Sequence, residues 1–350
     1  MYPRRASKAI HIGLVQIGGN APISVQSMTK TDTRDAGATI RQIKELEECG
    51  CEIIRVAVPD SEAASSLSTI KRGIRIPLIA DIHFDHRLAL EALAAGVDGL
   101  RLNPGNISDA GKVAEVVKAA KERQVPIRIG VNAGSLPHTP ASEQTIPQQM
   151  VTAAMHHIKL LEDLDFDLIK VSLKAFDVPT TIEAYKVISS LIPYPLHLGI
   201  TEAGTPRAGV IRSAAGIGTL LFLGLGDTIR VSLTTAPHEE VSAGYDILKS
   251  LGMRQHGPVL VSCPTCGRCE VDVIAIAAQV EQMLQKISKP LRVAVMGCVV
   301  NGPGEAKDAD IGIACGKGKA VLFKKGEQVA VIAEHEILAR LMCEIEDMQT

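Results

Sequence analysis

The chain has 350 residues, of which 46% are hydrophobic and 3% aromatic, with no Trp and a formal net charge of −2. This length suffices for one large domain and one smaller domain, both with aliphatic cores. The small net charge gives no reason to expect nucleic acid or an anionic membrane surface as a partner.

The N-terminal segment MYPRRASKAIHIG carries basic residues, but the long apolar run of a signal peptide does not follow it. The rest of the chain has no run of about 18 uninterrupted apolar residues, so we expect no membrane span. These features predict a cytoplasmic protein.

Short apolar segments alternate with amphipathic helical patterns up to about residue 255. Eight such segments begin at Pro22, Ile53, Pro77, Gly99, Pro126, Leu168, Pro195 and Thr228. They are brief, rich in β-branched residues and bounded by Gly or Pro, as buried parallel strands are. Eight repeats of strand then helix predict a (β/α)8 TIM barrel over residues 1–255. A doubly wound open sheet is the alternative, but it fits eight regular units less well.

Six of the eight predicted strands carry a basic residue or a histidine at a similar position. These residues are Arg55, Arg101, Arg128, Lys170, His197 and Arg230. Residues two or four apart on a strand share a face. The residues that therefore accompany them are Asn103, Asn132, Lys174 and Ser232. Buried cations need anions, and Arg binds phosphate groups through two hydrogen bonds. The pattern predicts a diphosphate site, although a single arginine would be explained more simply by a salt bridge.

Three further polar residues lie at or just beyond the carboxyl ends of predicted strands, where TIM-barrel active sites lie. Asp81, His83 and Glu202 are therefore predicted as catalytic residues, with Glu202 heading a Gly-containing loop at the barrel mouth. Asp81 fits equally well as the ion-pair partner of one arginine. Residues 137–150 are polar and contain Pro, so we expect a mobile loop after the fifth strand.

A short linker, residues 252–258, leads to a predicted small α+β domain over residues 256–350. We expect a helix over 271–287 and a closing helix over 334–348. The predicted strands are PVLVSC, LRVAVMG, ADIGIAC, KAVLFKKG and EQVAVIA. The stretch NGPG, residues 301–304, is predicted to be a loop that brings the backbone close to a metal.

Cys263, Cys266 and Cys269 show C-x-x-C-x-x-C spacing, and Cys298 follows the next predicted strand. Cysteines three apart across a tight turn can direct both sulfurs at one metal, and the Pro and Gly of CPTCGRC are expected to supply the turn. Nothing in the sequence indicates secretion, so a disulfide is less favoured. Thiolates hold both zinc and iron–sulfur clusters, and the spacing alone favours these two about equally.

CPTCGR followed by MGCVVNGPGEA resembles the 4-hydroxy-3-methylbut-2-enyl diphosphate synthase family of the non-mevalonate isoprenoid pathway. Further similar motifs cover nearly the whole chain: VQSMT, IRVAVP, ADIHFD, RLNPGNI, RIGVNAGSL, HLGITEAG and GDTIRVSL. The resemblance implies one [4Fe-4S] cluster per chain, held by Cys263, Cys266, Cys298 and Glu305. It leaves Cys269 as a bystander, although spacing alone would select it. A carboxylate ligand should exchange more readily than a thiolate and leave one iron open to substrate.

The resemblance also implies the reaction. It is the reductive dehydroxylation and ring opening of 2-C-methyl-D-erythritol 2,4-cyclodiphosphate to 4-hydroxy-3-methylbut-2-enyl diphosphate, with Glu202 assisting proton transfer. Two electrons would come from reduced ferredoxin or flavodoxin, because GLGDTIR lacks the G-x-G-x-x-G pattern of dinucleotide-binding sites. A head-to-tail homodimer with shared active sites is implied as well. Two other hypotheses are a barrel aldolase or isomerase with a structural zinc domain, and a non-catalytic iron–sulfur sensor of a phosphorylated metabolite.

Overall fold

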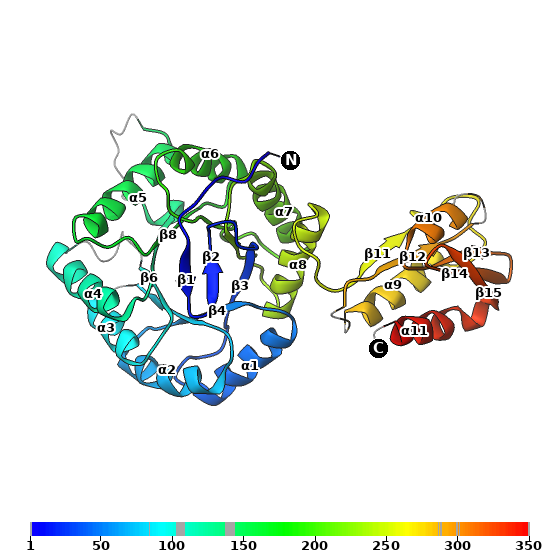
Figure 1. The fold of residues 1–350 in the computed structure, drawn as a ribbon, viewed down its shortest axis with the longest axis horizontal. Coiled ribbons are helices and arrows are strands. Elements are labelled where there is room, and N and C mark those ends of the chain that lie inside the picture. The colour runs from blue at the N-terminus through cyan, green and yellow to red at the C-terminus, as the bar shows by residue number, and fades with distance from the viewer. Residues whose placement is uncertain are drawn as a thin grey trace. The chain divides into compact units, whose positions relative to one another are not determined.

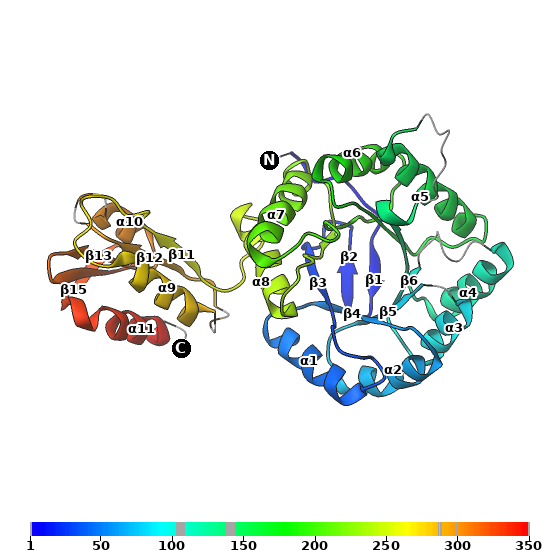
Figure 2. The ribbon, with the colours of Figure 1, turned by 180° about the vertical axis from the view of Figure 1, so that it is seen from behind.

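The computed structural model describes residues 2–83, 85–102, 109–136, 144–285, 287, 289–298, 300 and 302–348. The chain forms two compact units, Met1–Arg254 and Gln255–Thr350 (Figures 1 and 2). Within the described ranges, no helix has both the length and the hydropathy needed to cross a bilayer.

The larger unit is a barrel of eight parallel strands surrounded by helices (Figure 1). The strands are β3 (Ser24–Met28), β4 (Ile53–Ala57), β5 (Leu78–Ile82), β6 (Gly99–Leu102), β7 (Ile127–Asn132), β8 (Ile169–Lys174), β9 (His197–Leu198) and β10 (Thr228–Ile229). Their order is β8-β7-β6-β5-β4-β3-β10-β9, and a bridge between Val171 and Leu196 joins the two ends of the sheet. The predicted (β/α)8 TIM barrel is confirmed.

Helices α1 to α8 form the outer ring (Figures 1 and 2). They are α1 (Ala36–Glu48), α2 (Ser61–Gly73), α3 (His86–Ala94), α4 (Ala110–Arg123), α5 (Ile146–Glu162), α6 (Val178–Ser189), α7 (Pro206–Phe222) and α8 (Pro237–Ser250). In α1, α2, α3, α4 and α6 the first turn is capped by an aspartate carboxylate that accepts a backbone N–H. These caps are Asp35, Asp60, Asp85, Asp109 and Asp177. The helices therefore begin at defined points beyond the carboxyl ends of the strands.

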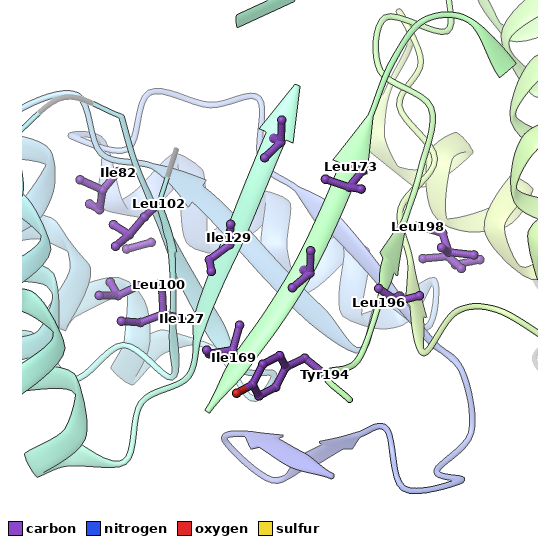
Figure 3. Packing of buried hydrophobic residues seen from close by; sticks show 14 of the residues in the cluster. Ile82, Leu100, Leu102, Ile127, Ile129, Ile169, Leu173, Tyr194, Leu196 and Leu198 are labelled. Atoms are coloured by element: carbon purple, nitrogen blue, oxygen red, sulfur yellow. The ribbon is translucent and has the colours of Figure 1, made fainter. Parts of the chain in front are cut away.

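The barrel strands direct apolar side chains outward, towards the helices. Ile127, Ile129, Ile169 and Leu173 are buried in this outer core (Figure 3). The alternate positions of β7 and β8 face the lumen and hold Arg, Gly and Asn on one strand and Lys, Ser and Lys on the other. Most TIM barrels fill the lumen with Val, Ile and Leu. This barrel instead has a polar, cationic interior. Such residues do not serve the packing of the barrel core.

A small hairpin that the sequence reading missed precedes the barrel. Its strands, β1 (Ile10–Ile12) and β2 (Val15–Ile17), pair antiparallel. Three hairpin isoleucines pack against Ile53 and Ile79, which lie at the starts of β4 and β5. The hairpin therefore covers the amino end of the barrel, and the carboxyl end of the strands is the other face.

The smaller unit is a five-stranded sheet with helices on both faces. Its strands, in spatial order, are β11 (Val259–Ser262), β12 (Arg292–Met296), β13 (Ile311–Gly316), β14 (Lys319–Lys324) and β15 (Glu327–Ala333). The first three run parallel and the last two pair antiparallel. Helices α9 (Val273–Leu284) and α11 (Ile337–Asp347) share one core with this sheet, and α10 (Gly302–Asp308) packs into another.

Two predicted loops are wrong in part. The predicted loop at 301–304 is the start of α10, apart from residue 301, which lies outside the described residues. Gly302 fits there because a Cβ at this position would lie only 3.0 Å from Ala314 Cβ and 3.1 Å from Met296 Cβ. Proline is tolerated in a first helical turn. Of the predicted mobile loop 137–150, residues 137–143 lie outside the described residues, whereas 146–150 begin α5. There the Gln148 side chain accepts the Thr145 N–H at 2.9 Å, a helix start that the sequence reading overlooked.

Candidate functional site

A row of charged side chains crosses the barrel interior on four neighbouring strands. Asp81, Arg101, Arg128 and Lys170 are register partners from β5 to β8, so their side chains point the same way, into the lumen. None of the four is more than 4% exposed. The strand positions selected from the sequence are thus brought together in one buried row.

Asp81 is the anion of this row. Its carboxylate lies 3.1 Å from the Arg101 guanidinium, 3.5 Å from Arg55 Nε and 3.4 Å from His83 Nε2. Burial by itself would raise the pKa of Asp81, but Arg55, His83 and Arg101 together hold that pKa well below its usual value. The carboxylate therefore stays ionised near neutral pH, which suits an ion-pair partner better than a proton carrier.

A second buried anion, Glu240, was not identified from the sequence. It lies in the first turn of α8, and its carboxylate is 3.5 Å from Arg230 and 3.2 Å from Lys30 Nζ. It also accepts the backbone N–H of Leu233 at 2.9 Å. Side chains alternate between the two faces of a strand, so Lys30, two residues beyond Met28 at the end of β3, lies on the same face as Met28. That parity could have revealed Lys30.

The remaining cations have no acidic partner within the described residues. Arg128 Nε and NH1 and Lys170 Nζ are buried without a hydrogen-bond partner there. Lys174 Nζ lies 3.5 Å from His197 Nε2, and His197 Nδ1 is also buried without one. Burial, and next the nearby Arg128, lower the pKa of both lysines well below the usual value. These side chains form a group of donors that a bound anion would satisfy.

Two glycines provide the space that these cations occupy. A Cβ at Gly130 on β7 would lie 2.9 Å from Arg101 Nε. A Cβ at Gly199, just after β9, would lie 2.6 Å from Lys174 Nζ. Any larger residue at either position would displace a cation from the lumen.

Other predicted site residues lie at the carboxyl end of the barrel. Asn132 ends β7 and is the register partner of Lys174, and Ser232 is half-buried two residues beyond Arg230. Glu202 is exposed on the turn after β9 and has a φ of +54°, a left-handed conformation that is costly for a non-glycine residue. Asn103 lies outside the described residues.

In the smaller unit, cysteines gather at the carboxyl edge of two adjacent parallel strands. Cys263 directly follows β11 and donates its N–H to Val295 on β12 at 3.1 Å. Cys298 stands two residues beyond the end of β12 and is buried, whereas Cys266 is exposed. Thr265 supplies the left-handed residue between Cys263 and Cys266, with a φ of +63°. The Gly of the motif belongs instead to the following turn, which a hydrogen bond from Cys269 to Cys266 closes.

Cys269 faces the domain core. A Cβ at Gly297 would clash with Cys269 Sγ and would lie 2.6 Å from a Val273 methyl group. The Glu270 N–H also donates to the Gly297 carbonyl at 3.3 Å. Cys269 therefore joins the first cysteine loop to the segment that carries Cys298.

The fourth proposed ligand, Glu305, is exposed in the first turn of α10, which begins shortly after Cys298. Across the described ranges, no three His, Cys, Asp or Glu side chains form a ready-made metal site. The donor set at this edge, three thiols and a carboxylate, nevertheless has the chemistry of an iron–sulfur site with one exchangeable ligand.

Solved structures support the barrel fold alone. Dihydropteroate synthase from Yersinia pestis aligns with a TM-score of 0.52 at 12% identity, over 70% of this chain and 98% of that chain. A type I 3-dehydroquinate dehydratase from Clostridium difficile aligns with a TM-score of 0.50 at 16% identity, over 70% and 98%.

Sequence comparisons cover both units. A family model described as the GcpE TIM-barrel domain matches residues 7–245, and one described as the GcpE protein C-terminal domain matches residues 259–347. A protein of Dehalococcoides mccartyi named 4-hydroxy-3-methylbut-2-en-1-yl diphosphate synthase (flavodoxin) is 69% identical over 99% of both chains. A protein of the same name from Thermodesulfovibrio yellowstonii is 56% identical over 99% of both chains. The resemblance seen in the motifs is thus confirmed, and the chain belongs to the GcpE family.

Proposed function

We propose that the protein is a 4-hydroxy-3-methylbut-2-en-1-yl diphosphate synthase. It takes 2-C-methyl-D-erythritol 2,4-cyclodiphosphate, adds two electrons and protons, releases one hydroxyl oxygen as water and opens the ring. The observation that carries the proposal is the set of buried cations without acidic partners in a barrel whose close relatives bear this name. A cyclic diphosphate supplies the negative charge that these cations lack.

The diphosphate binds among Arg128, Lys170 and Lys174, the cations without an acidic partner in the described lumen. Further positive charge around the diphosphate comes from Arg55 and Arg101, which both pair with Asp81, and from Arg230. His197, Asn132, Ser232 and Asn103 are the remaining proposed contacts, all from the same strand parity. Guanidinium groups suit this role, because each can donate two parallel hydrogen bonds to phosphate oxygens.

Three cysteines and one glutamate, Cys263, Cys266, Cys298 and Glu305, hold one [4Fe-4S] cluster per chain. Support comes from the placement of both cysteine loops at one edge of β11 and β12 and from the inward packing of Cys269. When bound, such a cluster supplies electrons singly and offers a coordination position at its carboxylate ligand.

Proton delivery falls to Glu202 at the barrel mouth. Its side chain is exposed on a strained turn, so a bound substrate can reach the carboxyl group. Asp81 acts through the arginines that it orients, and His83 does so through its contact with Arg101 at 2.9 Å. The three residues predicted as catalytic thus take different roles, with Glu202 as the proton donor.

The electron donor is a reduced flavodoxin or ferredoxin in the cytoplasm. The names of the relatives specify flavodoxin. Flavodoxin and ferredoxin both transfer one electron at a time, which matches an iron–sulfur acceptor.

The active enzyme is a head-to-tail homodimer with shared sites. Arg254, the last residue of the barrel unit, contacts the Ile23 carbonyl at 2.7 Å and Glu52 at 3.2 Å, both just before barrel strands and hence at the amino end. Residues 255–258 then span at most roughly 18 Å before β11, whereas the reacting groups are proposed at the opposite end. A partner chain can present its cysteine loops to that mouth more easily, and two-fold symmetry makes both sites alike.

Subunit mixing tests this assembly. Cys298→Ser and Glu202→Ala are each expected to be inactive, and exchanged dimers should regain up to about half of the activity, because one of the two sites escapes both substitutions. Proven exchange without recovered activity would mean that each chain completes its own site.

The reaction itself is tested under anaerobic conditions against the two alternatives. An iron and sulfide content of four each per chain, with visible thiolate-to-iron absorption, excludes structural zinc. Conversion of the cyclic diphosphate with a chemical reductant excludes a sensor. A colourless zinc protein, or an iron–sulfur protein that binds the substrate without converting it, would overturn the proposal.

A further inference from the structure

Arg230 depends on a side chain from outside the strands. Its guanidinium lies 3.5 Å from Glu240 Oε2, and Glu240 is 2% exposed. We propose that Glu240 is a positioning residue that holds Arg230 and Lys30 at the barrel mouth, so that the substrate's diphosphate meets a fixed guanidinium. This inference rests on the proposed function only for the identity of the ligand.

The buried acids are divided between two groups of cations. Two buried acids form ion pairs with the strand cations, Asp81 on β5 and Glu240 on α8. Asp81 serves Arg55 and Arg101, whereas Glu240 serves Arg230 and Lys30. Without Glu240, Arg230 would face the repulsion of Arg55 with no counter-charge in contact, and its side chain would be driven towards solvent.

Glu240 and Lys30 also hold the loop that follows β10. Glu240 accepts the Leu233 N–H at 2.9 Å, and Lys30 Nζ donates to the Leu233 carbonyl at 3.0 Å and to the Thr235 carbonyl. Lys30 and Glu240 are themselves 3.2 Å apart. Together they tie this loop to the end of β3, so the segment that carries Ser232 is held from both sides.

Glu240 leaves part of the Arg230 guanidinium group available to a ligand. The Arg230 side chain is 15% exposed, and its Nε makes no hydrogen bond within the described residues. Glu240 therefore faces one end of the guanidinium group as an ion pair, without a hydrogen bond at Glu240 Oε2, while Arg230 Nε is left for an anion. An arginine fixed in this way loses less conformational entropy when it binds a phosphate.

Glu240→Gln tests the inference, because glutamine keeps the shape and can still accept the Leu233 N–H but carries no charge. We expect inorganic diphosphate, measured by calorimetry with the cluster-containing protein, to bind roughly tenfold more weakly, as one charge-assisted contact is misplaced. With the cyclic substrate, KM should rise more than kcat falls. Glu239→Gln, at the neighbouring exposed position, should change neither value.

A double-mutant cycle separates positioning from general stability. In an Arg230→Met background, Glu240→Gln should cost little further affinity for diphosphate, because the group that it positions is gone. The same loss in both backgrounds, or no loss in either, would overturn the inference. If Glu240→Gln does not fold, Lys30→Met replaces it in the cycle, with a loss of a few-fold that must vanish when Arg230 is absent.

The proposed function and this inference fail in different ways. A wild-type protein that does not bind diphosphate would refute the anion site itself. A wild-type protein that binds diphosphate no more tightly than Glu240→Gln would refute only the role of Glu240.

Discussion

Lys170 shows most directly how much stability the ligand-free protein loses by burying a cationic side chain in the barrel. It is 1% exposed, and its Nζ has no hydrogen-bond partner within the described residues. Methionine has nearly the same length, fills irregular space well and needs no partner. We therefore expect Lys170→Met to stabilise the ligand-free protein while it weakens diphosphate binding.

The magnitude follows from the cost of an unsatisfied buried polar group. That cost is about 1–3 kcal/mol, so removal of the amine should stabilise the barrel by about 2 kcal/mol. For a domain of this size each kcal/mol moves Tm by about 2–4 °C, so Tm should rise by about 4–8 °C.

The assay is thermal unfolding with and without inorganic diphosphate. Diphosphate should raise Tm strongly in the wild type and much less in Lys170→Met, because the variant lacks one of the cations that the ligand satisfies. Lys186→Met, at an exposed helix position, is the matched control and should change neither value beyond a degree or so. A Lys170→Met variant that melts several degrees below the wild type, with an unchanged response to diphosphate, would show that Lys170 is an ordinary structural lysine.

Protonation of the buried lysines and retention of the cluster in the small domain provide the remaining tests. Burial lowers the pKa of Lys170 and Lys174, so the unfolded chain binds more protons than the folded one. The free energy of unfolding of the ligand-free protein should therefore fall as pH decreases from about 10 towards neutral, and it should fall less in Lys170→Met. An equal dependence of this free energy on pH in both proteins would contradict the prediction. Diphosphate binding should take up protons, seen as a buffer-dependent calorimetric heat; a heat that does not vary with buffer would mean that the lysines are already charged. Serine at any of the three proposed cysteine ligands should abolish the cluster spectrum, whereas Cys269→Ser should keep it. Glu305→Ala should leave an oxygen-labile cluster with little activity. An apoprotein from Glu305→Ala would instead make Glu305 structural. Gly297→Ala should lower cluster retention, because the new methyl group would clash with Cys269 and Val273. The additional substitution Cys269→Ala should restore part of the cluster retention. Retention equal to wild type in Gly297→Ala would show that the loop can accommodate the methyl group.

The barrel could be predicted because its strands carry the information locally. Each is a short apolar run, and six of the eight carry a basic residue or a histidine on the opposite parity. The alternation survives in the structure from Ile127 to Asn132 and from Ile169 to Lys174. The hairpin at Ile10–Ile17 was missed because two three-residue strands make no pattern long enough to detect.

The second anion was missed for a different reason. The sequence HEEV contains two adjacent glutamates, and only the packing of α8 against the barrel buries Glu240 and leaves Glu239 at the surface. Its partners, Lys30 and Arg230, come from distant segments, so no local spacing connects them. The helix at Gly302–Asp308 was missed because Gly and Pro argue against helices, and its packing against β12 and β13 overrides that propensity.

In the proposed reaction, the barrel cations bind a cyclic diphosphate and the cluster of the small domain supplies the electrons that reduce it. This reaction is tested most directly by anaerobic turnover with a known amount of reduced flavodoxin, followed by phosphorus NMR of the substrate and the product. We expect one 4-hydroxy-3-methylbut-2-en-1-yl diphosphate to form for every two electrons consumed, with no product from Cys298→Ser. Electrons consumed without product, or product formed by the variant that lacks the cluster, would contradict it.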